Sequence, residues 1–197
     1  GTGARSGGLQ GGVGSASVTI AGVGTVGALV VVNSVGSVID QTTALPWEVG
    51  ATGLVAPDRD DRRRLRDFMS SRTAPTSAST ASSLNTVIGV VATDVALDKA
   101  ECSRMATVAH DGLARAVRPA HSMNDGDSIF ALSTAESVGD PLSLSRTDEG
   151  SFTERTGRVA RLNRLLEASA DAFSLAVTVA VVNAVGRGST PAYRDLC

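Results

Sequence analysis

The chain has 197 residues and a net charge of −2, and its length favours one domain. Its apolar fraction is 42% but its aromatic fraction only 3%, so valine, alanine and leucine must fill most of the core. The balanced charge excludes the basic footprint of a nucleic-acid-binding domain. The two cysteines, Cys102 and Cys197, lie too far apart in sequence to suggest a disulfide framework or a zinc knuckle.

The beginning of the chain is rich in glycine. Residues 1–15 are expected to form loops, followed by a short strand at 16–22 and a long strand at 25–40 that is interrupted near Asn33. The intervening GVGTVG at 22–27 matches the glycine pattern of a dinucleotide-binding loop. However, β-branched residues follow it instead of a helix whose N-terminus would bind the pyrophosphate, so we interpret it as a hairpin turn.

A polar segment follows these strands. Residues 41–56 have an irregular pattern, and the charged stretch 57–71 is compatible with a short exposed helix. Residues 72–85 are small and polar and cannot bury enough apolar surface to offset their ordering entropy. We therefore predict a flexible linker over about 57–85.

The second half of the chain has a sharper pattern. The apolar run at 86–94 predicts a strand buried on both faces. Residues 97–119 have helical spacing, with Asp98 as N-cap and Glu101 as its capping-box partner. The remaining elements are a strand, a loop and a long helix, at 127–134, 136–151 and 153–186. Because strands and helices are grouped rather than strictly alternating, we predict an α+β fold with helices layered on a sheet.

The sequence offers no clear metal, cofactor or membrane signal. His110 and His121 lack the i, i+4 spacing of helical metal ligands and have no Cys/His cluster beside them, so both are interpreted as structural. The longest apolar run, 175–185, is too short to span a membrane, and no signal peptide is visible. We expect no metal, no cofactor and no membrane or nucleic-acid partner, and a cytoplasmic location.

The Asn85-Thr86 dipeptide lies where the polar tract meets the apolar strand. One interpretation is that Thr86 merely begins the strand, and the local pattern alone favours it. The other is that the chain is cut before Thr86. Its hydroxyl would attack the Asn85 carbonyl to form an ester, and water would then release a free α-amine. Such an amine, with a pKa of roughly 7.7–8, suits a general base for the neighbouring hydroxyl.

Three polar residues are further candidates. Asp125 and Asp127 could orient the amine and hydroxyl of Thr86, although a turn before a strand is an equally simple role for them. Asn33 could donate to a developing oxyanion, an interaction worth ~3 kcal/mol in the transition state, or it could cap a turn. The pattern by itself leaves both pairs of alternatives open.

The stretch NTVIGVVATDVALDKAECSRMATVAHDGLARAVRPAHSMNDGDSIFALST at 85–134 resembles the start of the β-chain in P1-family (S58, DmpA-type) peptidases, and is most similar to their nylon-oligomer hydrolase branch. The glycine-rich opening and the stretch at 25–37 resemble the C-terminal part of the family's α-chain. The resemblance implies a single hydrolase domain over 1–197, divided into an α-chain-like part at 1–85 and a β-chain-like part at 86–197.

The resemblance also implies a fold and a set of site residues. The fold is an αββα sandwich of the N-terminal-nucleophile type that cuts itself into two chains. By match of motif, Thr86 is the nucleophile, Asn85 precedes the cut, Asn33 is the oxyanion-side amide, and Asp125 and Asp127 position the nucleophile. The threonine and the aspartate pair favour the nylon-oligomer branch, because the aminopeptidase branch has a serine and a glutamate at the pair.

Two departures from the family qualify this expectation. The family has a long segment before the GTG turn, with strands and an active-site tyrosine, so we expect the chain to be incomplete at its N-terminus. Gln10 stands where a lysine is expected. We predict a self-processing amide hydrolase that acts on small peptides, β-peptides or ω-amino-acid oligomers. We also expect a homo-oligomer, because family members commonly are oligomers. The alternatives are an uncut, inactive fragment or a non-catalytic relative and, on the GVGTVG match alone, a nucleotide-binding module.

Overall fold

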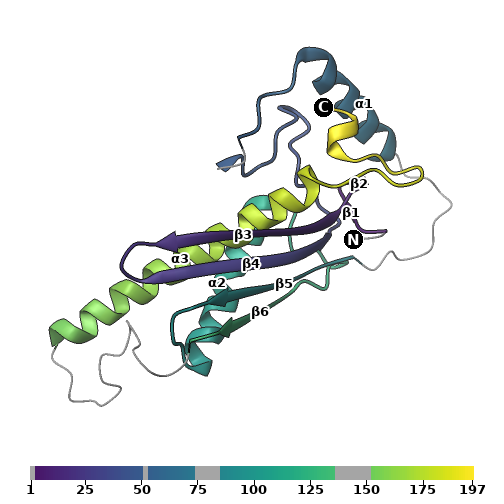
Figure 1. Ribbon diagram of the computed structural model, residues 1–197. Coiled ribbons are helices and arrows are strands. Elements are labelled where there is room, and N and C mark those ends of the chain that lie inside the picture. The colour runs from purple at the N-terminus through teal and green to yellow at the C-terminus, as the bar shows by residue number, and fades with distance from the viewer. Residues whose placement is uncertain (1–2, 51–52, 74–84, 136–151) are drawn as a thin grey trace.

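The computed structural model describes residues 3–50, 53–73, 85–135 and 152–197 (Figure 1). The predicted loop at 136–151 and the linker residues 74–84 lie outside these ranges. In chain order the elements are β1 (Arg5–Ser6), β2 (Leu9–Gln10), β3 (Gly12–Ile20), β4 (Gly24–Asn33), α1 (Arg59–Thr73), β5 (Thr86–Thr93), α2 (Lys99–Ala116), β6 (Ser128–Ser133), α3 (Phe152–Val182) and the 3-10 helix η2 (Tyr193–Asp195).

A four-stranded sheet in the order β3-β4-β5-β6 forms the centre of the molecule. β3, β4 and β5 pair antiparallel, and β6 pairs parallel to β5 after the crossover through α2. The GVGTVG motif forms the β3–β4 hairpin, as predicted, with Ile20 paired to Gly24. The glycine-rich opening, expected to be loops, instead forms the small β1–β2 pair and the start of β3. The predicted strand at 25–40 ends at Asn33.

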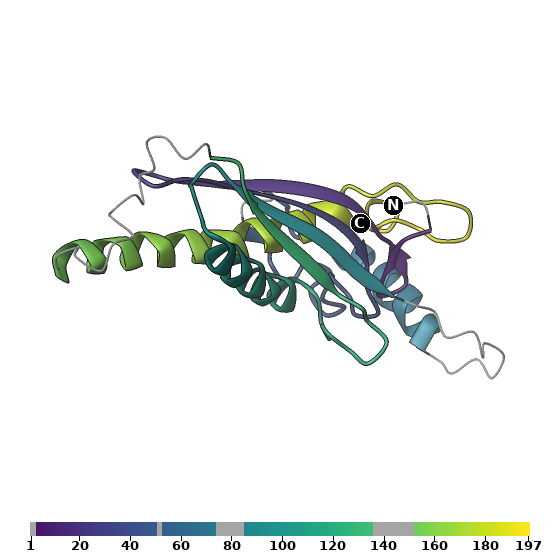
Figure 2. The ribbon, with the colours of Figure 1, turned by 90° about the horizontal axis from the view of Figure 1, so that it is seen from below.

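Helices α2 and α3 cover one face of the sheet (Figure 2). α3 packs closely on β3, where an added Cβ at Gly14 would lie 2.1 Å from the Ala176 carbonyl oxygen. Helices α2 and α3 are equally close at Gly112, where an added Cβ would lie 2.2 Å from the Ala170 carbonyl oxygen. Small residues at these contacts explain how a core with so few aromatic side chains is packed. The predicted capping box is present, because Asp98 and Glu101 each accept the other's backbone N–H.

The opposite face of the sheet carries exposed apolar side chains. Along β5, Val87, Val91 and their alternate neighbours are buried against the helices, whereas Ile88 is 49% exposed. The prediction that this strand is buried on both faces is therefore wrong for the described residues, because their helices lie on one side only. The large apolar side chains on this open face are Val13, Leu29, Val31, Ile88, Phe130 and Leu132.

The charged stretch at 57–71 forms α1, and part of that helix is packed. Leu65 and Met69, one helical turn apart, are 0% and 4% exposed and join the core. Residues 59–73 therefore belong to the folded part of the chain and not to the predicted linker, because this i, i+4 apolar pair anchors the helix.

The long helix α3 is more apolar than the sequence analysis expected. Its segment Thr156–Val182 has the length and composition of a membrane-spanning helix, with a mean hydropathy of 1.7 in its most apolar window. In the structure 67% of that window is buried, and the helix packs on β3, β4 and α2. Core helices of compact domains have the same composition, so its apolar character is explained by packing.

Candidate active site

Thr86 and Asn33 lie side by side on two neighbouring strands. Thr86 is the first residue of β5 and Asn33 the last of β4, and they face each other in the antiparallel register. Residues directly opposite in such a pair project to the same face of the sheet. Here that face is the open one, because the alternate residues Val32 and Val87 are buried against the helices. The sheet register thus brings together two candidate residues that are 53 positions apart in sequence.

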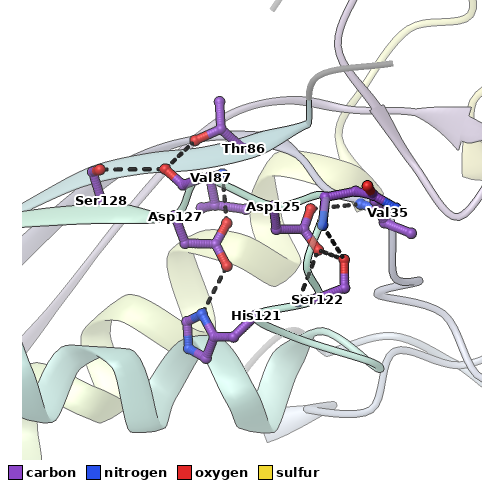
Figure 3. Close-up of polar contacts among 10 residues, drawn as sticks. Val35, Thr86, Val87, His121, Ser122, Asp125, Asp127 and Ser128 are labelled. Atoms are coloured by element: carbon purple, nitrogen blue, oxygen red, sulfur yellow. Dashed lines mark hydrogen bonds and ion pairs between the residues drawn. The ribbon is translucent and has the colours of Figure 1, made fainter. Parts of the chain in front are cut away.

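The backbone of Gly126 bonds both the hydroxyl of Thr86 and the carbonyl of Asn85. The Thr86 hydroxyl donates to the Gly126 carbonyl oxygen at 2.8 Å (Figure 3). The Gly126 N–H donates to the Asn85 carbonyl oxygen at 3.0 Å. The Asn85 N–H in turn donates to the Asn124 carbonyl oxygen at 3.3 Å. The turn before β6 therefore holds both the hydroxyl of Thr86 and the carbonyl that this hydroxyl would have to attack.

Asp125 connects this turn to the end of β4. Its Oδ1 accepts the backbone N–H of Val35 at 3.1 Å, and its Oδ2 accepts both the hydroxyl and the N–H of Ser122, at 2.6 and 3.3 Å (Figure 3). The side chain thus fixes the segment that follows Asn33 relative to the turn that holds Thr86. In this arrangement Asp125 orients backbone and does not contact the Thr86 hydroxyl, which donates to Gly126.

Asp127 holds the residue after Thr86. Its side chain is 4% exposed; Oδ1 accepts the Val87 N–H at 2.8 Å, and Oδ2 lies 2.8 Å from Nδ1 of His121. The sequence analysis expected the two aspartates to act directly on the amine and hydroxyl of Thr86. The described geometry instead places the Asp127 carboxylate on the peptide group that follows Thr86.

Asn33 and Gln10 are tied to the glycine-rich opening of the chain. Oδ1 of Asn33 accepts the Arg5 N–H at 3.0 Å, which fixes which end of the amide carries the oxygen and which the NH2 group. Gln10, where a lysine was expected, is 4% exposed, and its Nε2 donates to the Ala4 carbonyl oxygen at 2.8 Å. Gln10 therefore ties β2 to the residue before β1, and β1 supplies Arg5, the partner of Asn33.

His121 is the residue of this site that the sequence analysis missed, having assigned it a purely structural role. Its imidazole contacts Asp127 and lies beside His110 of α2, with ring centroids 5.0 Å apart. Burial, followed by the neighbouring His121, lowers the pKa of His110. The one feature of the sequence that could have pointed to His121 as part of this site is its place four residues before Asp125 and six before Asp127. Among the described residues no group of three His, Cys, Asp or Glu side chains is arranged to hold a metal ion.

Taken together, the described residues place a hydroxyl, an amide donor and a polarised peptide carbonyl at one end of the open face. The hydroxyl belongs to Thr86, the amide to Asn33 and the carbonyl to Asn85. This arrangement suits nucleophilic attack by a hydroxyl on a carbonyl carbon whose oxygen is stabilised by N–H donors.

The comparisons with known proteins agree with one another on a family. The family model described as peptidase family S58 matches residues 1–190. A protein of Mycobacterium leprae described as an uncharacterized aminopeptidase is 42% identical over 198 residues, which are 98% of this chain and 50% of the relative. A similarly described protein of Mycobacterium tuberculosis is 42% identical over 201 residues, covering 98% of this chain and 54% of that protein. The chain thus spans about half the length of the curated relatives it matches.

Solved structures share the fold at lower identity. A Burkholderia sp. beta-aminopeptidase matches with a TM-score of 0.57 and 23% identity, covering 96% of this chain and 46% of the other. The L-aminopeptidase D-Ala-esterase/amidase of Ochrobactrum anthropi, described as a variant of the Ntn hydrolase fold, matches with a TM-score of 0.57 and 24% identity, covering 96% and 45%. At this identity the likeness establishes the fold alone.

Proposed function

The chain belongs to peptidase family S58, and on that premise we propose that it carries the nucleophile of a self-processing amide hydrolase, with Thr86 as that nucleophile. The observation that supports this most directly is a pair of hydrogen bonds with the Gly126 backbone: the Thr86 hydroxyl donates to the Gly126 carbonyl oxygen, and the Gly126 N–H donates to the Asn85 carbonyl oxygen. One residue of the turn before β6 thereby holds both the hydroxyl that would attack and the carbonyl that it would attack.

Self-cleavage begins with the hydroxyl that Gly126 orients. Oγ1 of Thr86 attacks the carbonyl carbon of Asn85, and the oxyanion that forms is the oxygen already accepting the Gly126 N–H. Collapse of this intermediate breaks the C–N bond: the acyl group moves to oxygen as an ester, and the proton lost by the hydroxyl goes to the nitrogen, which becomes an amine. Water then hydrolyses the ester, leaving a carboxylate on Asn85 and a free amine and hydroxyl on Thr86.

Turnover of a substrate uses both groups of the new N-terminus. The α-amine takes the proton of the hydroxyl, and the oxygen attacks the substrate amide. Asn33, directly opposite Thr86 on β4, donates its NH2 to the oxyanion. Asp125 holds the backbone N–H of Val35, just after β4, and Asp127 holds the backbone N–H of Val87, just after the nucleophile. The proton passes to the leaving amine, and water releases the acyl group from Thr86.

We also propose that a second sheet packs against the open face, which completes the αββα sandwich implied by the resemblance. The described residues supply one sheet layer and one helix layer. Thr86 and Asn33 lie at the end of the face that carries Phe130, Ile88 and their apolar neighbours. A layer seated there would exclude water from the apolar surface and form the second wall of the substrate pocket.

The substrate class we propose is small peptides, β-peptides or ω-amino-acid oligomers. The relatives and the solved structures are described as aminopeptidases, one of them as a beta-aminopeptidase. The threonine nucleophile and the pair Asp125 and Asp127 favour the nylon-oligomer branch by resemblance. Assaying an amino-acid anilide, a β-dipeptide and a linear 6-aminohexanoate oligomer in parallel distinguishes these three substrate classes.

The test is intact-mass analysis of the purified, folded chain. We expect two chains, residues 1–85 and 86–197, in the unaltered protein and in Thr86→Ser, and a single chain in Thr86→Ala. Ser128→Ala is the matched control, because the Ser128 hydroxyl donates to the same Gly126 carbonyl at 3.3 Å but is not expected to attack. A folded protein that stays whole would favour the second candidate, an uncut and inactive relative.

A further inference from the structure

We propose that His121 is a positioning residue for the reaction of Thr86: it holds Asp127, and Asp127 holds the peptide group that follows the nucleophile. This inference rests on the proposed function, but its structural part can be tested without any activity. His121, Asp127 and Val87 form a continuous chain of contacts, with 2.8 Å from Nδ1 to Oδ2 and 2.8 Å from the Val87 nitrogen to Oδ1 (Figure 3).

The first argument is the burial of the Asp127 carboxylate. With only 4% of the side chain exposed, its charge needs partners on both oxygens, because a buried carboxylate without them is strongly destabilised. One oxygen accepts the Val87 N–H and the other contacts the imidazole. Without a donor at His121, water or another group must replace it, and the carboxylate is free to rotate away from Val87.

The second argument is the backbone of His121. Its φ of 54° lies in the left-handed region, which non-glycine residues adopt infrequently. Such a conformation persists only where the surrounding structure determines it, and it concentrates at functional sites. Here its result is to direct the ring toward Asp127.

The third argument is the side from which His121 approaches. The Thr86 side chain lies on the open face, whereas Val87 is buried against the helices and His121 packs beside His110 of α2. The imidazole is 41% exposed and lines a shallow groove of about 630 Å³ together with His110, Thr107 and Ile129. His121 therefore reaches the nucleophile through Asp127 and Val87 and not through contact with a substrate on the open face.

The experiment compares His121→Asn with His121→Asp. The two replacements have nearly the same size and both tolerate a left-handed backbone, but only asparagine can donate to Asp127, whereas aspartate repels it. His110→Asn is the control for the groove, because it changes the neighbouring ring without touching Asp127. His121→Gly, which also accepts the backbone conformation and removes the donor, replaces His121→Asp if the latter does not fold.

The first readout is amide hydrogen exchange at Val87, measured in the Thr86→Ala background so that every chain remains uncut. We expect exchange to be about tenfold faster or more in His121→Asp, and to stay within about threefold of the parent in His121→Asn and His110→Asn. Equal exchange rates in folded His121→Asn and His121→Asp proteins would overturn the proposal.

The second readout is the rate at which the two chains appear when Thr86 is present. We expect this rate to fall about tenfold in His121→Asp and to be largely kept in His121→Asn, because a misplaced nucleophile loses rate steeply. A wild-type rate in His121→Asp would also overturn the proposal. A parent chain that never cleaves would instead refute the proposed function, and exchange at Val87 would still decide whether His121 holds the site.

Discussion

Asn33 and Thr86 face each other across β4 and β5, and both side chains project from the uncovered face of the sheet. Opposed residues in an antiparallel pair have Cβ atoms about 4.5–5.5 Å apart, which is within reach of an amide donor. The oxygen of the Asn33 amide is already bonded to the Arg5 N–H. The register of two strands therefore sets the distance between the proposed nucleophile and the proposed oxyanion donor.

Replacing the Asn33 amide tests this relationship. In Asn33→Asp the side chain still accepts the Arg5 N–H but has no NH2 to donate, and we expect kcat for amide hydrolysis to fall by about 10²–10³, the usual cost of one oxyanion donor. Steady-state kinetics and circular dichroism, measured together, separate this loss from unfolding. Full activity in Asn33→Asp would remove Asn33 from the mechanism.

Side chains added at position 126 should act on the Thr86 hydroxyl. An added Cβ at Gly126 would lie 3.9 Å from Oγ1 of Thr86, an ordinary contact, so Gly126→Ala should cleave at close to the parental rate. The extra methyl groups of Gly126→Val extend further, and we expect them to displace the hydroxyl and slow the appearance of the two chains on a denaturing gel. Identical rates for the two variants would show that this contact is not needed.

The open apolar face should be the main site at which the chain binds apolar dyes and associates with itself. Phe130, on the edge strand β6 of this face, is 64% exposed, whereas Val185, similarly exposed at 63%, lies beyond the end of α3. We expect Phe130→Ser to lower both binding of an apolar fluorescent dye and self-association in light scattering, and Val185→Ser to lower neither. An equal effect of the two substitutions would show that the face has no special role.

Two glycines in neighbouring strands should differ in how their replacement by alanine changes the free energy of unfolding. An added Cβ at Gly14 would meet backbone atoms of α3 at 2.1 and 2.5 Å, whereas at Gly27 it would meet nothing within 4 Å. We expect Gly14→Ala to lower the free energy of unfolding by about 1–3 kcal/mol. We expect Gly27→Ala to leave the free energy of unfolding unchanged or to raise it by roughly a few tenths of a kcal/mol, because alanine restricts the unfolded chain more than glycine does. Urea unfolding midpoints provide the measurement.

The stability of the fold should depend on the protonation of His110. Burial and the nearby His121 lower its pKa below the ordinary 6.5, an effect that Asp127 and Asp111 partly oppose. Between the unfolded-state pKa of 6.5 and the lower pKa of the folded state, the unfolded chain binds more protons at His110 than the folded chain does. The free energy of unfolding therefore falls as the pH decreases through this range. We expect the loss between pH 7.5 and 5.5 to be smaller in His110→Gln, as measured by chemical denaturation. If His110→Gln lost as much stability between pH 7.5 and 5.5 as the parent, groups other than His110 would cause the pH dependence.

Sequence patterns were sufficient for the elements that depend on local chemistry. The capping box at Asp98 and Glu101, the GVGTVG hairpin and the helix at 97–119 are confirmed, because each depends on residues close together in the chain. The resemblance carried by 85–134 is confirmed as membership of peptidase family S58, and the expected Ntn-hydrolase type of fold by the solved structures. Self-cleavage at Thr86, the substrate class, homo-oligomers and a cytoplasmic location stay predictions.

Tertiary structure decided which groups those residues contact. Composition cannot tell that the described part of the chain covers β5 on one face only, because a run of apolar β-branched residues fits either environment. Nor could spacing reveal that Asp125 and Asp127 bond backbone groups at positions 35 and 87, or that His121 reaches Asp127. These contacts join segments up to 90 residues apart, and only the register of the sheet and the path of the turn before β6 bring them within hydrogen-bond distance.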